Sequence, residues 1–410
     1  MMQYLTSIGL LGLILNAIPA CEQQVKPETH MYIDTLELST EEHQKVKADN
    51  QFTLDLFAQT LKQAEADENL LISPLSVSMS LGMAANGAVG TTQEALYKTL
   101  RFEGFKPGFI NPYYQKLMQA LPHLDSAVQI NIANSIWYKD SFKVDPDFLK
   151  TNAEYYQATA TGLDFTDSKS IDKINTWVSE NTKGKIPSIV ETLPADLRML
   201  LVNALYFKGA WETPFKQEQT RLDQFTSPSG EVETPFMHRQ GSIPVSIGSS
   251  YRAVELAYGK EKMYSMLAVL PEAGVNPASL LQEFQENPDT WADFSPRMVS
   301  LDMPKFSYSY ERTLNQDLGH LGMDLPMSPQ ADFTGMSPQG GLRISEVKHK
   351  TFIEVNEEGT EAAAATSTGI SVTSMPMYLE MHFNRPFIFF IRENTSGLIL
   401  FAGSVQNPAQ

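Results

Sequence analysis

Residues 357–366 read Glu-Glu-Gly-Thr-Glu-Ala-Ala-Ala-Ala-Thr, and this stretch constrains the fold more than any other. Its composition is also typical of a surface helix or a linker. As a strand, however, it would expose two different faces, because successive side chains alternate. One face carries only Thr360, Ala362, Ala364 and Thr366, whereas the other carries Glu361, Ala363 and Ala365. Since burying an unpaired charge is costly, the uncharged face predicts a segment that can enter a sheet as a central strand, with Gly359 as its pivot.

The sequence around this segment mixes strand and helix patterns without regular alternation. Apolar runs predict strands over residues 129–138, 199–208, 263–270, 299–308, 348–356, 387–392 and 398–403. Helical spacing predicts helices over residues 39–66, 77–86, 168–182 and 279–285. No repeat of 20 to 50 residues and no Gly/Ser-rich or Pro-rich linker divides the chain. We therefore expect one α+β domain.

The composition excludes several classes of partner. The 410 residues are 42% hydrophobic and 19% charged, as in ordinary globular proteins, and carry a formal net charge of -17. A phosphate-backbone binder needs clustered Lys and Arg, so nucleic acid is excluded as a partner. The same charge argues against loose adsorption to an anionic membrane.

Residues 1–20 have the features of an export signal. The apolar run of residues 8–15 is too short to span a bilayer, and it is followed by Ile18-Pro19-Ala20-Cys21. These four residues resemble the lipobox of bacterial lipoproteins, although Pro19 and the lack of Lys or Arg in residues 1–7 depart from the usual pattern. The resemblance implies cleavage before Cys21, lipidation of Cys21 and anchoring at the outer membrane or cell surface. An ordinary signal peptide, giving a secreted or periplasmic protein, is the alternative.

Residues 21–45 are expected to be a flexible tether between the lipidated Cys21 and a folded domain over residues 46–407. Cys21 is the only cysteine in the chain. A disulfide framework and a catalytic cysteine are therefore both excluded.

Seven segments, in order along residues 46–407, resemble the serpin family. They are Asn69–Ser76 (N-x-x-x-S-P-x-S), Asn134–Tyr138, residues 175–186 (N-x-W-V followed by T-x-G-K-I), Leu201–Trp211 (L-x-N-A-x-x-F-K-G-x-W), Met303–Phe306, Glu357–Thr366 and Phe383–Phe387. The resemblance implies a single α+β domain with three β-sheets, eight to nine helices and an exposed reactive loop at about residues 357–382. Cleavage of that loop lets it insert as a new central strand, an established example of strand addition.

The resemblance also implies an activity. The protein is expected to be an irreversible suicide-substrate inhibitor of a serine protease, with a cysteine protease as the alternative, and not an enzyme. The protease attacks the loop, and insertion must then outrun hydrolysis of the acyl-enzyme. The product is a covalent 1:1 complex with a monomeric inhibitor that needs no cofactor and no metal, and whose only contact with a membrane is its lipid anchor.

Individual residues acquire roles through the resemblance. The hinge of the loop comprises Glu357, Gly359, Thr360, Ala362, Ala363, Ala364 and Ala365. A hydrogen-bonded cluster at the sheet opening comprises Ser73, Ser76, Asn203 and His349. Trp211 and an ion pair between Lys305 and Glu357 are placed at the entry of the loop. Without the resemblance, His349 could equally be an ordinary core histidine.

The scissile bond is predicted by counting along the loop. Counting from Gly359 gives Thr373-Ser374, with Val372-Thr373 as the runner-up, whereas counting back from Phe383 gives Met375-Pro376. We favour the first count, because Pro after the cut lacks an N–H and restricts its neighbour. No Lys or Arg lies between Gly359 and Asn384, which argues against a trypsin-like target. Ile370, Val372 and Thr373 favour an elastase-like or subtilisin-like protease, and Met375, Met377 and Tyr378 leave a chymotrypsin-like one as an option.

Two other functions compete with inhibition. A secreted hydrolase is the first, but the chain has no G-x-S-x-G, H-E-x-x-H or P-loop motif. A serpin that acts as a binding or carrier module is the second. Such members typically place charged or bulky residues in the hinge, whereas this chain has Thr360 followed by Glu361 and four alanines.

Overall fold

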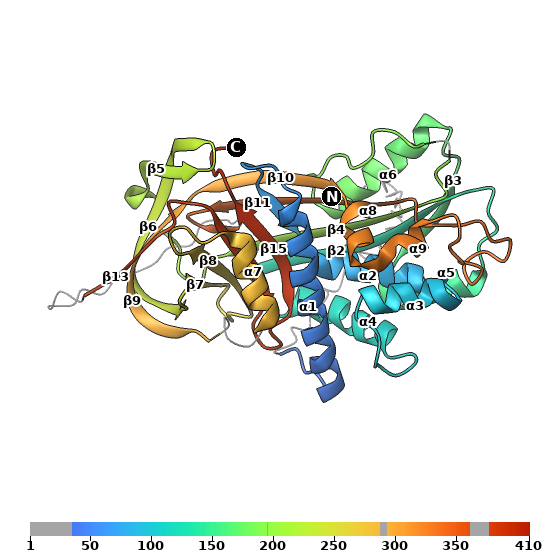
Figure 1. Cartoon of the computed structure of the whole chain (residues 1–410), viewed down its shortest axis with the longest axis horizontal. Coiled ribbons are helices and arrows are strands. Elements are labelled where there is room, and N and C mark those ends of the chain that lie inside the picture. Colours follow the sequence, from blue (N-terminus) through green and yellow to red (C-terminus); the bar gives the residue numbers. More distant parts are fainter. Residues whose placement is uncertain (1–34, 195, 288–292, 361–376) are drawn as a thin grey trace, which may run out of the picture. The chain divides into compact units, whose positions relative to one another are not determined.

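The computed structural model describes residues 35–194, 196–287, 293–360 and 377–410 (Figure 1). Its helices are α1 (Thr40–Lys62), α2 (Pro74–Ala85), α3 (Gly90–Thr99), α4 (Ile110–Ala120), α5 (Pro146–Tyr156), α6 (Ser168–Asn181), α7 (Pro277–Glu286), α8 (Asn315–Leu318) and α9 (Asp324–Met327). Its strands are β1 (Leu70–Ile72), β2 (Val128–Lys139), β3 (Thr159–Leu163), β4 (Met199–Ala210), β5 (Arg221–Ser227), β6 (Gly230–Ile247), β7 (Tyr251–Tyr258), β8 (Tyr264–Pro271), β9 (Ser295–Pro304), β10 (Phe306–Thr313), β11 (Glu346–Asn356), β12 (Gly359–Thr360), β13 (Leu379–His382), β14 (Phe387–Glu393) and β15 (Ile399–Val405).

The described strands form two hydrogen-bonded sheets, so the expected count of three is not what the described residues show. The larger sheet has nine strands in the order β1-β15-β14-β8-β7-β6-β9-β13, with β5 also pairing with β6. Its length follows from β6, whose 18 residues pair first with β5 (residues 230–236), then with β9 (residues 236–245) and at the end with β7 (residues 245–247). One long strand therefore joins what would otherwise be two separate sheets.

The smaller sheet has six strands in the order β10-β11-β12-β4-β2-β3. Its centre is the antiparallel pair β2 and β4, which stays in register from Val128 opposite Gly209 to Tyr138 opposite Met199. All but two of the residues of β4 are buried, which fits its nearly continuous apolar sequence. This sheet carries the candidate site.

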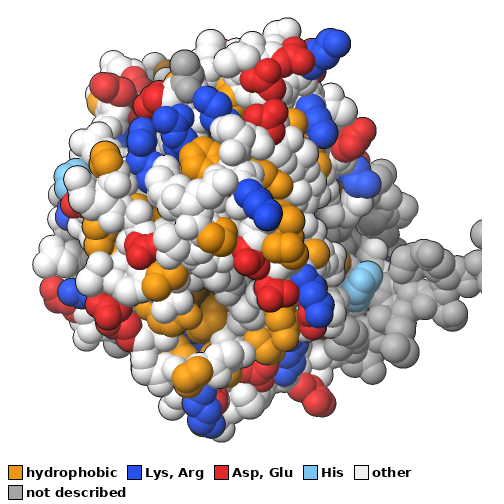
Figure 2. Space-filling view, turned by 90° about the vertical axis from the view of Figure 1, so that its right-hand side faces the viewer, with side chains coloured by type: hydrophobic (Ala, Val, Ile, Leu, Met, Phe, Trp, Pro, Cys, Tyr) orange, Lys and Arg blue, Asp and Glu red, His pale blue; other side chains and the backbone are white. Residues whose placement is uncertain are grey.

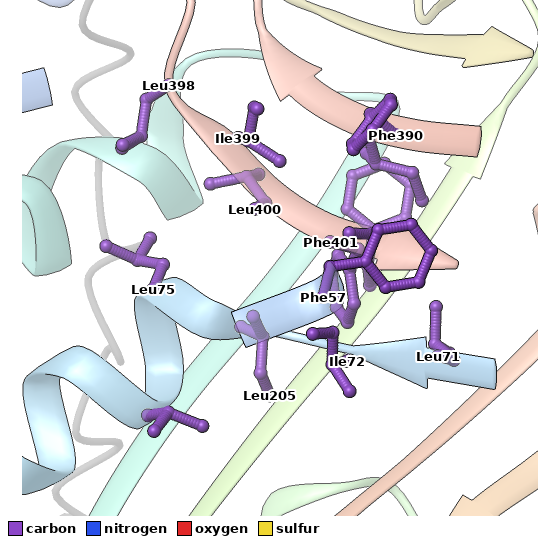
Figure 3. Packing of buried hydrophobic residues seen from close by; sticks show 14 of the residues in the cluster. Phe57, Leu71, Ile72, Leu75, Leu205, Phe390, Leu398, Ile399, Leu400 and Phe401 are labelled. Atoms are coloured by element: carbon purple, nitrogen blue, oxygen red, sulfur yellow. The ribbon is translucent and has the colours of Figure 1, made fainter. Parts of the chain in front are cut away.

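The main core lies where α1 and α2 pack against the sheets. Figure 3 shows Phe57 of α1 and Leu75 of α2 facing Phe401 of β15 and Leu205 of β4. These side chains belong to one large buried apolar cluster, and Phe57 meets Phe390 edge to face at 6.1 Å. A second, smaller cluster lies between α6 and the other face of the six-stranded sheet, and contains Ile174, Val178, Leu200 and Val202.

Helix α1 begins at Thr40, which agrees with the helix predicted from residue 39 but overlaps the tether predicted over residues 21–45. Ser39 and Glu42 form a reciprocal capping box, which satisfies exposed N–H groups at the start of the helix. Lys45 is fully buried and pairs with Asp49. Residues 40–45 thus belong to the folded body, and the predicted boundary at residue 46 is too late.

Most predicted elements are present, and the described residues form one compact unit, as expected for a single α+β domain. The strand predicted over residues 299–308 is instead two strands, β9 and β10, which are separated at Lys305. Helices α3, α4, α5, α8 and α9 and strands β3, β5, β6, β7 and β13 were not predicted. Basic and acidic side chains are interspersed on the face shown in Figure 2. Within the described residues, no helix has the length and apolar character needed to cross a bilayer.

Candidate functional site: an open slot in the six-stranded sheet

Strands β11 and β4 pair with each other at one end and are held apart by the short strand β12 at the other. We call the unpaired stretch between them the slot, with a closed end where the strands pair and an open end at β12. The two strands run parallel and pair directly only where residues 346–349 lie opposite residues 200–203. Further along, residues 350–354 pair outward with β10, and residues 204–208 pair outward with β2. No described strand lies between these two five-residue stretches, so one hydrogen-bonding edge of each faces the other.

The short strand β12 occupies the open end of the slot. Thr360 lies opposite Val355 on β11 and opposite Gly209 on β4, and β12 is antiparallel to both neighbours. Gly359 has φ +150°, and a Cβ atom there would lie 2.1 Å from the carbonyl oxygen of Gly209. No side chain fits at that distance, so the tight entry requires glycine at this position.

Thr360 is held by an aromatic pair. Its hydroxyl lies 2.7 Å from the hydroxyl of Tyr258, whose ring stacks on Trp211 with 4.5 Å between centroids. The Trp211 indole N–H donates to the carbonyl of Asn356, 2.9 Å away. Burial raises the pKa of the Tyr258 phenol, which therefore stays protonated. Trp211 thus lies at the entry of the slot, where the sequence places it.

The predicted ion pair is present beside this entry. Lys305 Nζ lies 2.8 Å from Glu357 Oε2, and the Thr220 hydroxyl donates to Glu357 Oε1 at 2.6 Å. Burial alone would raise the pKa of Glu357, but the hydrogen bonds from Lys305 and Thr220 outweigh it and lower this pKa. Glu357 is therefore a charged, fixed point from which the loop departs.

His349 lies at the closed end of the slot. The ring is buried, and its Nε2 accepts a hydrogen bond from the backbone N–H of Ser73 at 3.0 Å. Burial lowers the pKa of His349 from 6.5 to about 4, so the ring is neutral at physiological pH, with its proton on Nδ1. The Ser73 hydroxyl donates to the carbonyl of Leu400, which ties α2, β11 and β15 together.

The other two predicted members of this cluster, Asn203 and Ser76, form only part of the predicted hydrogen bonding. Asn203 is the strand partner of His349, but its amide donates to Asn134 Oδ1 at 2.5 Å. Asn203 Oδ1 and the Ser76 hydroxyl are buried and have no hydrogen-bond partner among the described residues. The four residues therefore lie near one another without forming the continuous network that the sequence predicted.

Some site residues were not predicted from the sequence. Tyr258 and Thr220 belong to segments far from the loop in sequence, and no local motif marks them as its contacts. Asn134 begins the quoted motif Asn134–Tyr138, but its bond to Asn203 was not predicted. Conversely, several predicted residues lie outside the described residues. These are Ala362, Ala363, Ala364 and Ala365 of the hinge, the reactive-bond candidates Val372, Thr373, Ser374 and Met375, and Cys21.

Comparisons with known proteins agree on one family. A family model described as "Serpin (serine protease inhibitor)" matches residues 47–408. The chain is 36% identical to the leukocyte elastase inhibitor of Xenopus tropicalis, over 87% of this chain and 97% of that protein. It is 31% identical to human neuroserpin, over 85% of this chain and 88% of that protein.

Solved structures give the same result. The thermophilic serpin tengpin in its native state superposes with a TM-score of 0.82 at 32% identity, over 90% of this chain and 95% of that one. An Arabidopsis serpin in its native stressed conformation has a TM-score of 0.79 at 26% identity, over 91% of this chain and all of that one. With the slot, the wedged hinge and a match across most of its length, this chain belongs to the serpin family.

Proposed function

We propose that the protein is a suicide-substrate inhibitor that traps a serine protease, or alternatively a cysteine protease, by inserting its cleaved loop between β11 and β4. The observation that carries this proposal is the register of β12. Each further residue of the loop would move one position back along both neighbouring strands. Six positions beyond Thr360, Thr366 would reach Asn203 on β4 and His349 on β11, which are already partners of each other. One inserted strand therefore fits both edges of the slot in a single register.

Insertion would release free energy. About a dozen new backbone hydrogen bonds, at about 0.5–1.5 kcal/mol net each, would contribute on the order of 10 kcal/mol. The unpartnered Asn203 Oδ1 and Ser76 hydroxyl lie at the end of the slot that insertion must open, and leaving such groups buried costs about 1–3 kcal/mol each. The uncleaved protein is accordingly metastable and persists because of a kinetic barrier.

The covalent step is carried out by the catalytic groups of the protease, and the inhibitor contributes only the peptide bond that is attacked. The protease nucleophile attacks the carbonyl carbon of Thr373, the bond to the Ser374 nitrogen breaks, and the released amine takes up a proton. The loop is then held as an ester, or as a thioester on a cysteine protease. Inserting about 14 residues at about 3.3 Å each would carry the bound protease about 46 Å along the sheet. Complex formation requires that this movement precede attack of water on the ester.

The protease class follows from the loop sequence. Ile370, Val372 and Thr373 suit a shallow apolar pocket, so elastase-like or subtilisin-like enzymes are the proposed targets. The leukocyte elastase inhibitors among the relatives support this choice. We further propose that Cys21 is lipidated and holds the inhibitor at the outer membrane or cell surface, where it would meet extracellular or periplasmic proteases.

The test uses pancreatic elastase and the purified chain. We expect a complex of about 1:1 stoichiometry that survives SDS, and a peptide released by cleavage after Thr373 that mass spectrometry identifies. Thr360→Arg should turn the protein into a plain substrate, because Thr360 is only 2% exposed between β11 and β4 and a guanidinium cannot be buried there. A Thr360→Arg variant that still traps elastase would rule out loop insertion as the mechanism.

A further inference from the structure

The outer face of the slot carries charged side chains that have no role in the inhibitory steps proposed above. Lys208 and Glu354 each lie five positions beyond the partners Asn203 and His349, so both point to the face opposite those two. Lys185, in the segment after α6, reaches the same face. Its Nζ lies 3.8 Å from Glu354 Oε2 and 4.9 Å from the centre of the Phe352 ring. The mouth of the slot is thus lined by two lysines and one glutamate.

The register of β12 determines which loop residue would meet these charges. Glu361 follows Thr360 directly, so an extended β12 would place it opposite Lys208 on β4 and opposite Glu354 on β11. Directly opposite residues of antiparallel strands share a face, with Cβ atoms about 4.5–5.5 Å apart. An inserted Glu361 would therefore lie between the Lys208 cation and the Glu354 carboxylate, which carries the same charge as Glu361.

Before insertion, the Lys208 ammonium group is available to pair with Glu361. Lys208 forms no ion pair with any residue that the structure describes, whereas Glu354 is already paired with Lys185. Like charges directly opposite each other destabilise a sheet, and opposite charges stabilise it. With Lys208 and Lys185 in place, the inserted sheet would contain two lysines and two glutamates at this point.

We propose that Lys208, together with the Lys185–Glu354 pair, forms a receiving site for the Glu361 carboxylate. Lys208 and Lys185 are positioning residues: they speed the first step of insertion and do not touch the protease. The occupant is residues 361–370 of this chain, since β12 already leads into the slot and the charges are complementary. This inference rests on the proposed loop insertion.

The experiment is a charge-swap cycle with pancreatic elastase. Lys208→Glu places three acids together when Glu361 inserts, and should lower the ratio of trapped complex to cleaved, uncomplexed inhibitor about threefold. Adding Glu361→Lys to that variant should restore the ratio, and 0.5 M NaCl should shrink the defect of the single variant, because salt screens exposed charges. Lys183→Glu makes the same charge change at an exposed site two residues from Lys185, and should leave the ratio unchanged.

A second readout separates failure of this inference from failure of the proposed function. Each variant is cut in the loop, and the rise in melting temperature on cleavage is compared with that of the intact protein. If the unmodified chain shows no rise, insertion does not occur and the proposed function fails. If it shows a full rise and traps elastase, but Lys208→Glu behaves identically or Glu361→Lys does not rescue it, the receiving site is overturned.

Discussion

At the scale of single residues, His349 makes the closed end of the slot sensitive to pH. Its pKa is about 4 in the native state, against 6.5 for a histidine in water, so the unfolded chain binds the proton first as pH falls. The contribution of His349 to the free energy of unfolding is therefore fully present above about pH 6.5. It is lost as pH falls toward 4, by about 3 kcal/mol in total. We expect His349→Gln, which cannot titrate, to flatten the difference in urea midpoint between pH 7 and pH 4.5. Equal pH dependence of the two proteins would contradict this assignment.

Replacing Gly359 tests whether inhibition depends on the close packing at this residue or only on its unusual backbone conformation. Gly359→Ala places a Cβ against the Gly209 carbonyl, so the wedge formed by β12 should be expelled and more inhibitor should be consumed per protease trapped. Gly241 is the matched control, because it has a similar φ of +157° and open space around the Cβ position. Gly241→Ala should carry the same backbone strain without changing the number of inhibitors consumed.

At the scale of elements, the Lys305–Glu357 pair joins the junction of β9 and β10 to the departing loop. Lys305 is partly exposed, so solvent screens the pair, and we expect Glu357→Gln to cost about 1 kcal/mol. That loss should ease opening of the sheet and speed self-association at 45 °C about fivefold, as measured by size-exclusion chromatography. The control is Glu311→Gln, which removes the more exposed ion pair with Lys350, away from the loop entry, and should have no such effect.

The same scale shows what the sequence could predict. Residues 199–208, which are apolar except for Asn203 and Lys208, predict a strand, and the structure has β4 there, because a nearly continuous apolar run of this length is typical of a buried strand. The alternation after Gly359 predicts a strand, of which only the start, β12 (Gly359–Thr360), falls within the described residues. The break at Lys305 was missed, although the alternation of apolar residues changes phase there, from Leu301 and Met303 before it to Phe306 and Tyr308 after it. The length of the nine-stranded sheet was missed for a different reason: β6 alternates polar and apolar residues, and its partners are decided by pairing with distant strands.

The resemblance predicted one contact of the site, the ion pair between Lys305 and Glu357, and that pair is present. Asn134 and Asn203 also lie in the quoted motifs, but their hydrogen bond was not predicted. The Asn203–Asn134 bond depends on the register of β2 against β4, which local sequence does not determine. The buried contact between Tyr258 and Thr360 is likewise a product of packing, since the two residues are 102 positions apart.

At the scale of the whole molecule, the intact protein should be much less stable than its cleaved form. If insertion releases on the order of 10 kcal/mol, cleavage should raise the melting temperature by about 13 °C, because a folded domain of this size has an unfolding entropy of about 0.8 kcal/mol/K. Differential scanning fluorimetry before and after cutting the loop measures this rise. A fall in melting temperature on cleavage would mean that the loop contributes more outside the sheet than within it.

The pairing of β1 with β15 has a consequence for how the molecule is made. Leu70 lies opposite Ser404, so this edge of the nine-stranded sheet needs two segments roughly 330 residues apart. At a synthesis rate of about 5–20 residues per second, β1 waits roughly 15 to 65 seconds for its partner to leave the ribosome. During that interval this edge of the nine-stranded sheet cannot form, so the nascent chain cannot close its principal core.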